Sequence, residues 1–307
     1  MPELPEVTAL AAALDERLAG SVIEHVSIGS VNALKTADPP YASLLGRRVE
    51  GVARRGKLLV VLTAPGPGAA GGVADDAGPV AVVVHLSLSG WVRVLDHLPE
   101  PTMPRGKGYI AARFGFVRDT GAGREETGIE LTEAGTWKRL AVYIVRRLED
   151  VPAVAELGPE PLEDTFTFEA FRKILASHKQ QIKGLLRSQK AIAGIGNAYS
   201  DEILHAARLS PFAIASTLDD ATAERLYEAL RRVLSDAVDD AMGHAPEELK
   251  DEKRRTMRVH RRAGEPCPVC GDTILEVSFS DSALQYCPTC QTGGKPLADR
   301  RTSKFLK

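Results

Sequence analysis

The chain begins Met1-Pro-Glu-Leu-Pro-Glu-Val7, a stretch that supplies both the first element of the fold and the first candidate site. Pro2 is small enough that the initiator methionine is normally removed, which would leave a free secondary amine at the N-terminus. α-Amino groups titrate near pKa ~7.7–8.0, so part of this amine is unprotonated and nucleophilic at neutral pH. Its attack on a sugar or carbonyl carbon gives an iminium intermediate, and Glu3 beside it is suited to proton transfer.

The same residues also have the composition of an ordinary helix start. Pro5 and Glu6 suit the first helical turn, where a proline loses no hydrogen bond and an acid faces the positive end of the helix dipole. An alanine-rich amphipathic run follows as far as Leu14. These residues alone leave both interpretations open.

The length and composition of the chain are those of a globular protein of more than one domain. The chain has 307 residues, of which 44% are hydrophobic and 26% charged, so two or more cores are expected. No apolar run approaches the length of a membrane span, and the N-terminus lacks a signal-peptide pattern. We therefore expect no membrane partner and a cytoplasmic protein.

Charge is distributed unevenly along the chain. The net charge of −2 by itself argues against a nucleic-acid partner. The distribution argues the other way, because residues 250–262 carry seven Lys and Arg, among them Arg258, Arg261 and Arg262. The tail after Lys295 is also basic. A basic C-terminal third is the electrostatic pattern of a nucleic-acid-binding surface. The alternative is a solvated tail, which fits the last ten residues better.

All four cysteines lie within a short C-terminal stretch, as Cys267-x2-Cys270-x16-Cys287-x2-Cys290. In a cytoplasmic chain this spacing predicts a four-thiolate zinc ribbon rather than two disulfides. Four protein ligands complete a tetrahedron, so the single zinc ion is expected to be structural rather than catalytic.

The pattern of apolar residues changes near residue 150. Before it, short segments rich in β-branched residues predict strands of a sandwich or barrel: residues 22–28, 48–52, 57–62, 80–86, 91–95, 109–117 and 140–145. Beyond the stiff connector Leu157-Gly-Pro-Glu-Pro161, helical spacing predicts helices over residues 168–176, 182–186, 198–207 and 221–241. We expect three domains, at residues 1–150, 151–245 and 246–307.

In this order of elements, the sequence resembles the formamidopyrimidine-DNA glycosylase/endonuclease VIII family of base-excision repair enzymes. Short strings along most of the chain carry the resemblance: Pro2-Glu-Leu-Pro-Glu-Val7, Arg54-Arg-Gly-Lys-Leu-Leu59, His85-Leu-Ser-Leu-Ser-Gly90, Leu157-Gly-Pro-Glu-Pro-Leu162, Gln181-Ile-Lys-Gly-Leu-Leu186, Ile195-Gly-Asn-Ala-Tyr199, Gly264-Glu-Pro-Cys-Pro-Val-Cys270 and Tyr286-Cys-Pro-Thr-Cys-Gln291. Their joint occurrence in this order is far more specific than any one of them.

The resemblance implies an α+β multidomain fold. A helix and a two-sheet β-sandwich form the N-terminal domain, a helix–two-turn–helix element lies in the helical domain, and a zinc ribbon follows. It also implies double-stranded DNA in the cleft between domains, with Lys183, Gly196 and Asn197 contacting it. Backbone amides at a glycine-rich helix start can approach a phosphate, and Asn197 would add a side-chain donor. The alternative is a capping turn without a ligand.

The family chemistry transfers to three residues. Pro2 would attack C1′ of a damaged nucleotide, Glu3 would protonate the opening sugar, and Lys57 would hold the phosphate of the flipped nucleotide. The base must leave the helix to reach such a site, and strand cleavage by elimination would follow. The expected protein is therefore a bifunctional DNA glycosylase/AP lyase acting on damaged bases or abasic sites, as a monomer. For Lys57, the alternative is a commonplace lysine at a sheet rim.

Three departures from the family pattern bear on activity. Ser282 lies where the zinc hairpin usually carries an arginine that binds phosphate, and a lost charge-assisted contact costs roughly 1.5–3 kcal/mol. Arg258, Arg261 or Arg262 are candidates to compensate. Leu88 and Trp137 lie where the glycosylases carry other residues to fill the space left by the flipped base. Finally, the stretch Met242–His260 is short. Together these features argue against assigning 8-oxoguanine specificity.

Two rival functions remain open. The first is a catalytically weak relative that binds damaged or structured DNA, as Ser282 suggests and the intact N-terminal string opposes. The second is a zinc-ribbon protein that binds RNA or protein, which would make the N-terminal match accidental.

Overall fold

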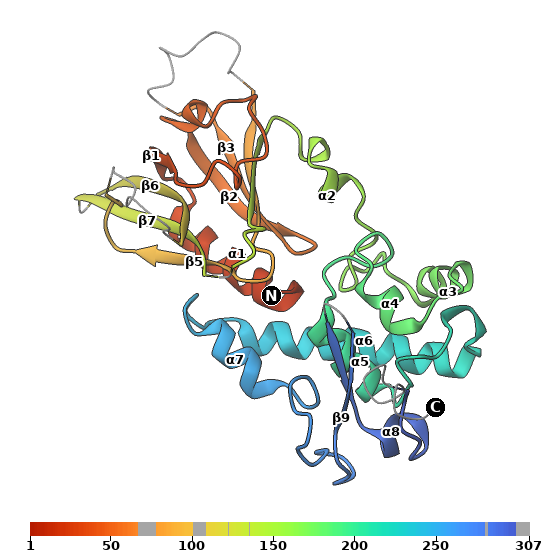
Figure 1. The fold of residues 1–307 in the computed structure, drawn as a ribbon. Coiled ribbons are helices and arrows are strands. Elements are labelled where there is room, and N and C mark those ends of the chain that lie inside the picture. Colours follow the sequence, from red (N-terminus) through yellow and green to blue (C-terminus); the bar gives the residue numbers. More distant parts are fainter. Residues whose placement is uncertain (67–77, 101–108, 122, 135, 280–281, 299–307) are drawn as a thin grey trace. The chain divides into compact units, whose positions relative to one another are not determined.

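The structure is a computed structural model that describes residues 1–66, 78–100, 109–121, 123–134, 136–279 and 282–298. The chain divides into two compact units, drawn in Figure 1. Unit 1 contains residues 1–156 and 241–250, and unit 2 contains residues 157–240 and 251–307. The basic tail beyond Leu297 lies almost wholly outside the described residues.

In its described residues, unit 1 contains one long helix and eight strands with short connecting elements. Helix α1 spans Leu4–Leu18. The strands are β1 (Val22–Ile28), β2 (Arg48–Arg55), β3 (Leu58–Ala64), β4 (Val80–His85), β5 (Gly90–Leu95), β6 (Ile110–Thr120), β7 (Gly123–Glu133) and β8 (Ala141–Val145). The connections include η1 (Tyr41–Leu44), η3 (Leu148–Asp150) and α2 (Pro152–Ala155).

The eight strands follow the order β5-β7-β6-β1-β2-β3-β4-β8. β1 pairs with β6 along its length but with β2 only at Val22 and Arg48. This narrow junction divides the strands into two four-stranded layers. Their inner faces share one apolar core with α1, including Leu14, Leu59 and Phe114. The predicted sandwich behind an N-terminal helix is therefore confirmed.

Helix α1 lies antiparallel to β2, and polar contacts fix this direction. The Asp15 carboxylate accepts a hydrogen bond from Val52 N at 2.7 Å, and Gly20 N donates to Val49 O at 2.9 Å. As the helix runs back toward its first residue, it therefore follows β2 forward toward Arg55. The N-terminus lies toward the end of the sheet where β2 turns into β3.

Unit 2 contains the remaining helices and a two-stranded ribbon. The helices are α3 (Phe168–Ser177), α4 (Ile182–Arg187), α5 (Asn197–Ala206), α6 (Asp220–Ala241), α7 (Leu249–Thr256) and α8 (Pro288–Thr292), with η4 at Ala215–Thr217; α6 and α7 each extend by one or two residues into unit 1. The ribbon pairs β9 (Leu275–Ser278) with β10 (Ala283–Tyr286). Within the described residues, no helix combines the length and apolarity needed to cross a bilayer.

Most of the predicted elements are present, within one or two residues for the helices. β7 and α7 were missed, because Gly123–Glu133 and Leu249–Thr256 are dominated by charged and polar residues. The fold class is confirmed. The three domain boundaries stay a prediction.

Candidate functional site

One end of the unit 1 sheet gathers the predicted residues of the N-terminal half. Arg55, Leu58, His85 and Ala141 are successive partners across β2, β3, β4 and β8. Three connections lie next to this row, at the same end of the sheet: the turn before Leu58, the turn between β4 and β5, and the loop before β8. Since α1 also starts toward this end, Pro2, Glu3, Lys57, Leu88 and Trp137 all belong to it.

The N-terminus is ordered by reciprocal hydrogen bonds between Glu3 and Glu6, each carboxylate accepting from the other residue's backbone N–H. Glu3 is the residue that caps α1, and its backbone N–H donates to Glu6 Oε2 at 2.8 Å. A carboxylate in the first turn satisfies an amide that the helix itself leaves unpaired. Pro2, Glu3 and Glu6 are all buried. The helix start is thus both a cap, as the simpler interpretation holds, and a fixed support for Pro2.

Lys57 lies directly before β3, in the turn after β2. Its side chain is only 8% exposed, and Arg54 closes the same turn by donating to Gly56 O at 2.8 Å. Burial, and secondarily the positive charge of Lys57, lower the pKa of His85 below its ordinary value. His85 is therefore neutral at pH 7, and Lys57 retains its positive charge beside it.

Leu88 is held outward by a tight turn. Gly90 N donates to Leu86 O at 2.9 Å, and Ser87 adopts a left-handed backbone with φ of 56°. A Cβ on Gly90 would lie 2.1 Å from Leu86 O, so only glycine fits this turn. Leu88 is 58% exposed. An exposed leucine on a strained turn is a feature of binding sites rather than of cores.

Trp137 is presented by the loop between β7 and β8. The buried carboxylate of Glu133 accepts hydrogen bonds from Arg139 N at 2.7 Å and Leu140 N at 2.9 Å. Trp137 itself is 76% exposed. Because Glu133 pairs with Gly90 across the sheet, this loop and the Leu88 turn start from neighbouring strand ends.

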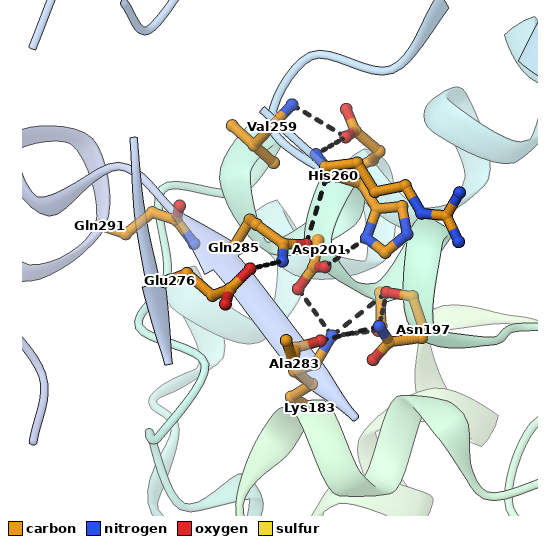
Figure 2. Close-up of polar contacts among 12 residues, drawn as sticks. Lys183, Asn197, Asp201, Val259, His260, Glu276, Ala283, Gln285 and Gln291 are labelled. Carbon is orange, nitrogen blue, oxygen red and sulfur yellow. Dashed lines mark hydrogen bonds and ion pairs between the residues drawn. The ribbon is translucent and has the colours of Figure 1, made fainter. Parts of the chain in front are cut away.

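In unit 2, Lys183 is part of a buried polar network (Figure 2). Its Nζ donates to Asp201 Oδ1 at 2.6 Å and to Ser200 Oγ at 2.8 Å. The second oxygen of Asp201 contacts His260 Nδ1 at 2.8 Å. The lysine that resemblance assigns to DNA contact thus also joins α4 to α5, and its role toward DNA stays a prediction.

Glu202, next to Asp201, holds the basic turn that precedes the ribbon. Its carboxylate accepts backbone hydrogen bonds from Arg258 at 3.0 Å, Val259 at 2.9 Å and His260 at 2.8 Å. Burial raises the pKa of Glu202, and the three amide donors oppose that rise. Arg258 and Arg261 are exposed on this turn.

The three arginines predicted to bind DNA differ in their local contacts. Arg261 has a left-handed backbone with φ of 61°, and its N–H donates to Gln285 Oε1 at 3.2 Å. Arg262 forms an ion pair with Glu265 at 3.0 Å. Arg258 and Arg261 are therefore more available for an anion than Arg262.

The turn before α5 matches the predicted anion-binding turn in backbone form. Gly194 has φ of 84°, and Gln189 closes the turn through Gly194 N at 2.9 Å and Ile195 O at 2.7 Å. Gly196 caps α5. Asn197 Nδ2 donates to Ala283 O at 2.8 Å, so one of its two side-chain hydrogens bonds to β10.

The four cysteines converge as the spacing predicts. Their sulfur atoms all lie within 4.8 Å of one another, with Cys267 Sγ 3.9 Å from Cys290 Sγ and Cys270 Sγ 3.3 Å from Cys287 Sγ. Four thiolates around zinc, each about 2.3 Å from the metal, would be separated by about 3.8 Å. The geometry fits a structural zinc ion, and all four protein ligands are accounted for.

Several residues that form the buried hydrogen bonds of unit 2 were not predicted from the sequence, among them Asp201, Glu202, His205 and His260. A signal was present, because an acidic pair in a helix that also carries Ala198, Ile203 and Leu204 requires hydrogen-bond partners once it is buried. Those partners include residues some sixty positions away in the chain. Sequence spacing alone gives no access to such pairs.

Comparison with known proteins gives matches along most of the chain. Three family models match: the formamidopyrimidine-DNA glycosylase N-terminal domain over residues 1–125, the formamidopyrimidine-DNA glycosylase H2TH domain over 157–246, and the zinc finger found in FPG and IleRS over 264–293. Together they cover the N-terminal, helical and ribbon parts in the predicted order.

Individual relatives agree with the models. A formamidopyrimidine-DNA glycosylase of Heliobacterium modesticaldum is 32% identical and is covered completely by 95% of this chain. An uncharacterized formamidopyrimidine-DNA glycosylase-like protein of Mycobacterium tuberculosis is 54% identical over 156 residues, which are 51% of this chain and 98% of that protein.

Solved structures share the fold. The crystal structure of MutM (Fpg) from Thermus thermophilus has a TM-score of 0.73 at 30% identity, over 96% of this chain and 100% of that chain. A MutM structure in complex with DNA containing carbocyclic 8-oxo-G has a TM-score of 0.77 at 22% identity, over 95% of this chain and 100% of that one.

Replacement of one zinc ligand should remove the metal. We expect Cys287→Ser to lower the zinc content from about one ion per chain to near zero and to lower the unfolding temperature, because a structural site contributes folding free energy. Metal analysis and thermal unfolding check both effects, with Thr289→Ser as a control between two ligands. Full zinc content in Cys287→Ser would contradict the four-thiolate site.

The stability of unit 1 should fall as the pH drops from 7 to 5. The pKa of His85 is lowered in the folded chain, so the unfolded chain binds its proton first, and acid favours unfolding. Where only the unfolded chain is protonated, the loss is about 1.4 kcal/mol per pH unit.

Urea unfolding followed by tryptophan fluorescence reports on this unit, since both tryptophans of the chain, Trp91 and Trp137, lie within it. His85→Gln should reduce the loss of unfolding free energy between pH 7 and pH 5. His97→Gln, at an exposed position, should leave that loss unchanged. Equal acid sensitivity in wild type and His85→Gln would show the idea to be wrong.

Proposed function

Because the chain belongs to the formamidopyrimidine-DNA glycosylase family, we propose that it is a bifunctional DNA glycosylase/AP lyase with Pro2 as its nucleophile. That it is a DNA glycosylase of this type follows from its relatives. The Schiff-base mechanism, the lyase step and the roles of individual residues are the proposal. The convergence of Pro2, Lys57, Leu88 and Trp137 at one end of the unit 1 sheet carries it.

The reaction begins once Met1 has been removed and the Pro2 nitrogen is a free secondary amine. The unprotonated nitrogen attacks C1′ of the damaged nucleotide. The base leaves with the electron pair of the glycosidic bond and takes up the proton that the amine loses. Glu3 supplies a proton to the sugar oxygen as the ring opens. The product is an iminium between Pro2 and C1′.

Strand cleavage follows from the same intermediate. The iminium withdraws electrons from C2′, so a proton leaves that carbon and the 3′ phosphate departs in β-elimination. A second elimination releases the 5′ phosphate, and water then frees the sugar fragment from Pro2. Lys57 would hold the phosphate of the flipped nucleotide, where its positive charge favours the departing anion.

The exposed apolar residues have a role in reaching the base. A nucleotide inside the helix is inaccessible to Pro2, and turning it out leaves a gap in the stack. Leu88 and Trp137 are suited to enter that gap, since an apolar wedge and a stacked ring offset part of the lost stacking energy.

Contacts to the DNA backbone would come from unit 2. The turn at Gly196 and Asn197 presents backbone amides at a helix start, and the exposed Arg258 and Arg261 add positive charge. We assign Lys183 and Arg262 lesser roles in DNA binding, because both already form ion pairs within the unit.

Ser282 favours a second candidate, a DNA-binding relative with little catalytic power. Ser282 O accepts a hydrogen bond from Phe279 N at 2.7 Å, which closes the ribbon hairpin without a cation at this position. If Arg258 and Arg261 fail to compensate for the missing arginine, the protein would bind damaged DNA but turn over slowly.

Pro2→Gly tests the proposed nucleophile. Glycine keeps a terminal amine but loses the secondary amine and the rigid ring, so we expect cleavage of an abasic-site duplex to fall at least about 100-fold. Binding of the same duplex should change little. Pro40→Gly, at an exposed proline, is the matched control, and cleavage is measured on denaturing gels with protein whose Met1 removal has been confirmed by mass.

The outcomes separate the two candidates. Wild-type cleavage in Pro2→Gly would reject Pro2 as the nucleophile. Specific binding without cleavage in the wild type would favour the weakly catalytic relative.

Leu88→Ala tests the wedge. Loss of an apolar side chain of this size should cost about 1–2 kcal/mol, or roughly 5–30-fold in affinity for a duplex with one abasic site. Affinity for undamaged duplex should stay the same. Leu45→Ala is the control, since Leu45 is 48% exposed and lies near Gly46 and Ile23, at the opposite end of the sheet. Equal losses on both duplexes would contradict a wedge.

A further inference from the structure

The zinc site has a neighbour outside the four cysteines. His205 Nε2 lies 3.3 Å from Cys267 Sγ. Both residues are only 3% exposed. No other side chain from outside the cluster, among the residues that the structure describes, hydrogen-bonds to any of the four sulfur atoms. His205 is the next-to-last residue of α5, so this contact joins the helical part of unit 2 to the metal site.

His205 is not itself a ligand. Among the described residues, the side chains able to hold one ion together are Cys267, Cys270, Cys287 and Cys290, and the imidazole falls outside that group. Zinc in a structural site takes four ligands, and the cysteines supply all of them. The ring nitrogen therefore contacts the sulfur of a ligand and not the metal.

The charge of the loaded site explains why a donor is needed there. Four thiolates and one Zn²⁺ carry a net charge of −2, and Cys267 and Cys287 are both buried. Buried anions require hydrogen-bond donors. Cys287 Sγ accepts from Cys290 N at 3.5 Å, and a backbone hydrogen bond from Asp272 reaches Cys270. For Cys267, the donor from outside the cluster is His205.

The direction of this hydrogen bond follows from the chemistry of its two partners. A zinc-bound thiolate has no proton to give and can only accept. The imidazole nitrogen facing it must therefore carry the proton, whatever the charge of the ring. An N–H donor withdraws electron density from the sulfur. It thereby lowers the free-energy cost of burying the negatively charged thiolate.

We propose that His205 is a positioning residue of the zinc centre, donating its Nε2–H to the Cys267 thiolate and thereby fixing α5 to the metal. The proposal depends on the structural zinc and not on the proposed enzyme activity. It adds to three other attachments of α5 to the C-terminal segment, which are Asn197 on Ala283 O, Asp201 on His260 Nδ1 and Glu202 on the amides of 258–260. Glu202 and His205 lie one helical turn apart, so they face the same side.

Two substitutions separate donation from packing. His205→Phe keeps an aromatic ring but has no donor, whereas His205→Gln keeps an N–H at a similar distance from the backbone. We expect His205→Phe to weaken zinc binding about 10–100-fold, as is typical for loss of an outer contact to a metal ligand, and His205→Gln to stay within about threefold of wild type. Competition with a chromogenic chelator measures the affinities.

A spectroscopic readout on the Co²⁺-substituted protein distinguishes a donor from a spacer. Loss of the donor makes the Cys267 sulfur more electron-rich, so the sulfur-to-cobalt charge-transfer band should shift to longer wavelength in His205→Phe and stay in place in His205→Gln. Leu204→Ala, a buried change on the same helix, is the control for altered packing and should lower stability without moving the band.

Unchanged zinc affinity and an unchanged band in His205→Phe would overturn the proposal. Equal losses in the Phe and Gln variants would also overturn it, because packing would then be the cause. If His205→Phe fails to fold, NMR of the wild-type protein loaded with ¹¹³Cd tests for the hydrogen bond directly. A scalar coupling between the metal and the His205 Nε2 proton supports the hydrogen bond, and its absence refutes it.

Discussion

The direction of α1 along β2 is the constraint on which the proposed active site depends. The Asp15 carboxylate on Val52 N and Gly20 N on Val49 O fix the helix antiparallel to the strand. A carboxylate that accepts a backbone N–H at 2.7 Å contributes more than a neutral hydrogen bond. Reversal of this direction would carry Pro2 to the far end of the sheet, away from Lys57 and the Leu88 turn. A nucleophile at a chain terminus has no covalent support beyond it, so the helix behind it must supply the positioning.

In unit 2, buried carboxylates hold basic segments of the chain in place through hydrogen bonds. Asp201 and Glu202 are almost fully buried, and each is hydrogen-bonded by groups from distant parts of the chain. Isolated buried charges are strongly unfavourable, so these two acids specify one arrangement of α4, α5 and the 258–261 turn. Through that arrangement Arg258 and Arg261 are presented outward on a fixed backbone. The basic surface that we propose for phosphate contact is thus supported by two buried acids.

Local patterns were sufficient to predict most of the fold. The β-branched segments gave β1 through β6 and β8, and the cysteine spacing gave the zinc site, because strand propensity and metal geometry act over short stretches. β7 was missed, since its first half, Gly123–Thr127, is dominated by charged residues and carries no apolar alternation. The candidate residues of unit 1 were found through resemblance, and their convergence depends on strand register. The partners of Glu202 and His205 were inaccessible, because each pair joins residues about sixty positions apart.

In the proposed mechanism, the amine of Pro2 forms the covalent intermediate. The most direct measurement is borohydride reduction of the protein on a duplex with one abasic site, followed by protease digestion and tandem mass spectrometry of the DNA-linked peptide. We predict that the sugar remnant is attached to the N-terminal peptide that begins at Pro2, with Met1 absent. Attachment to a lysine such as Lys57, or a trapped peptide that still carries Met1, would contradict it.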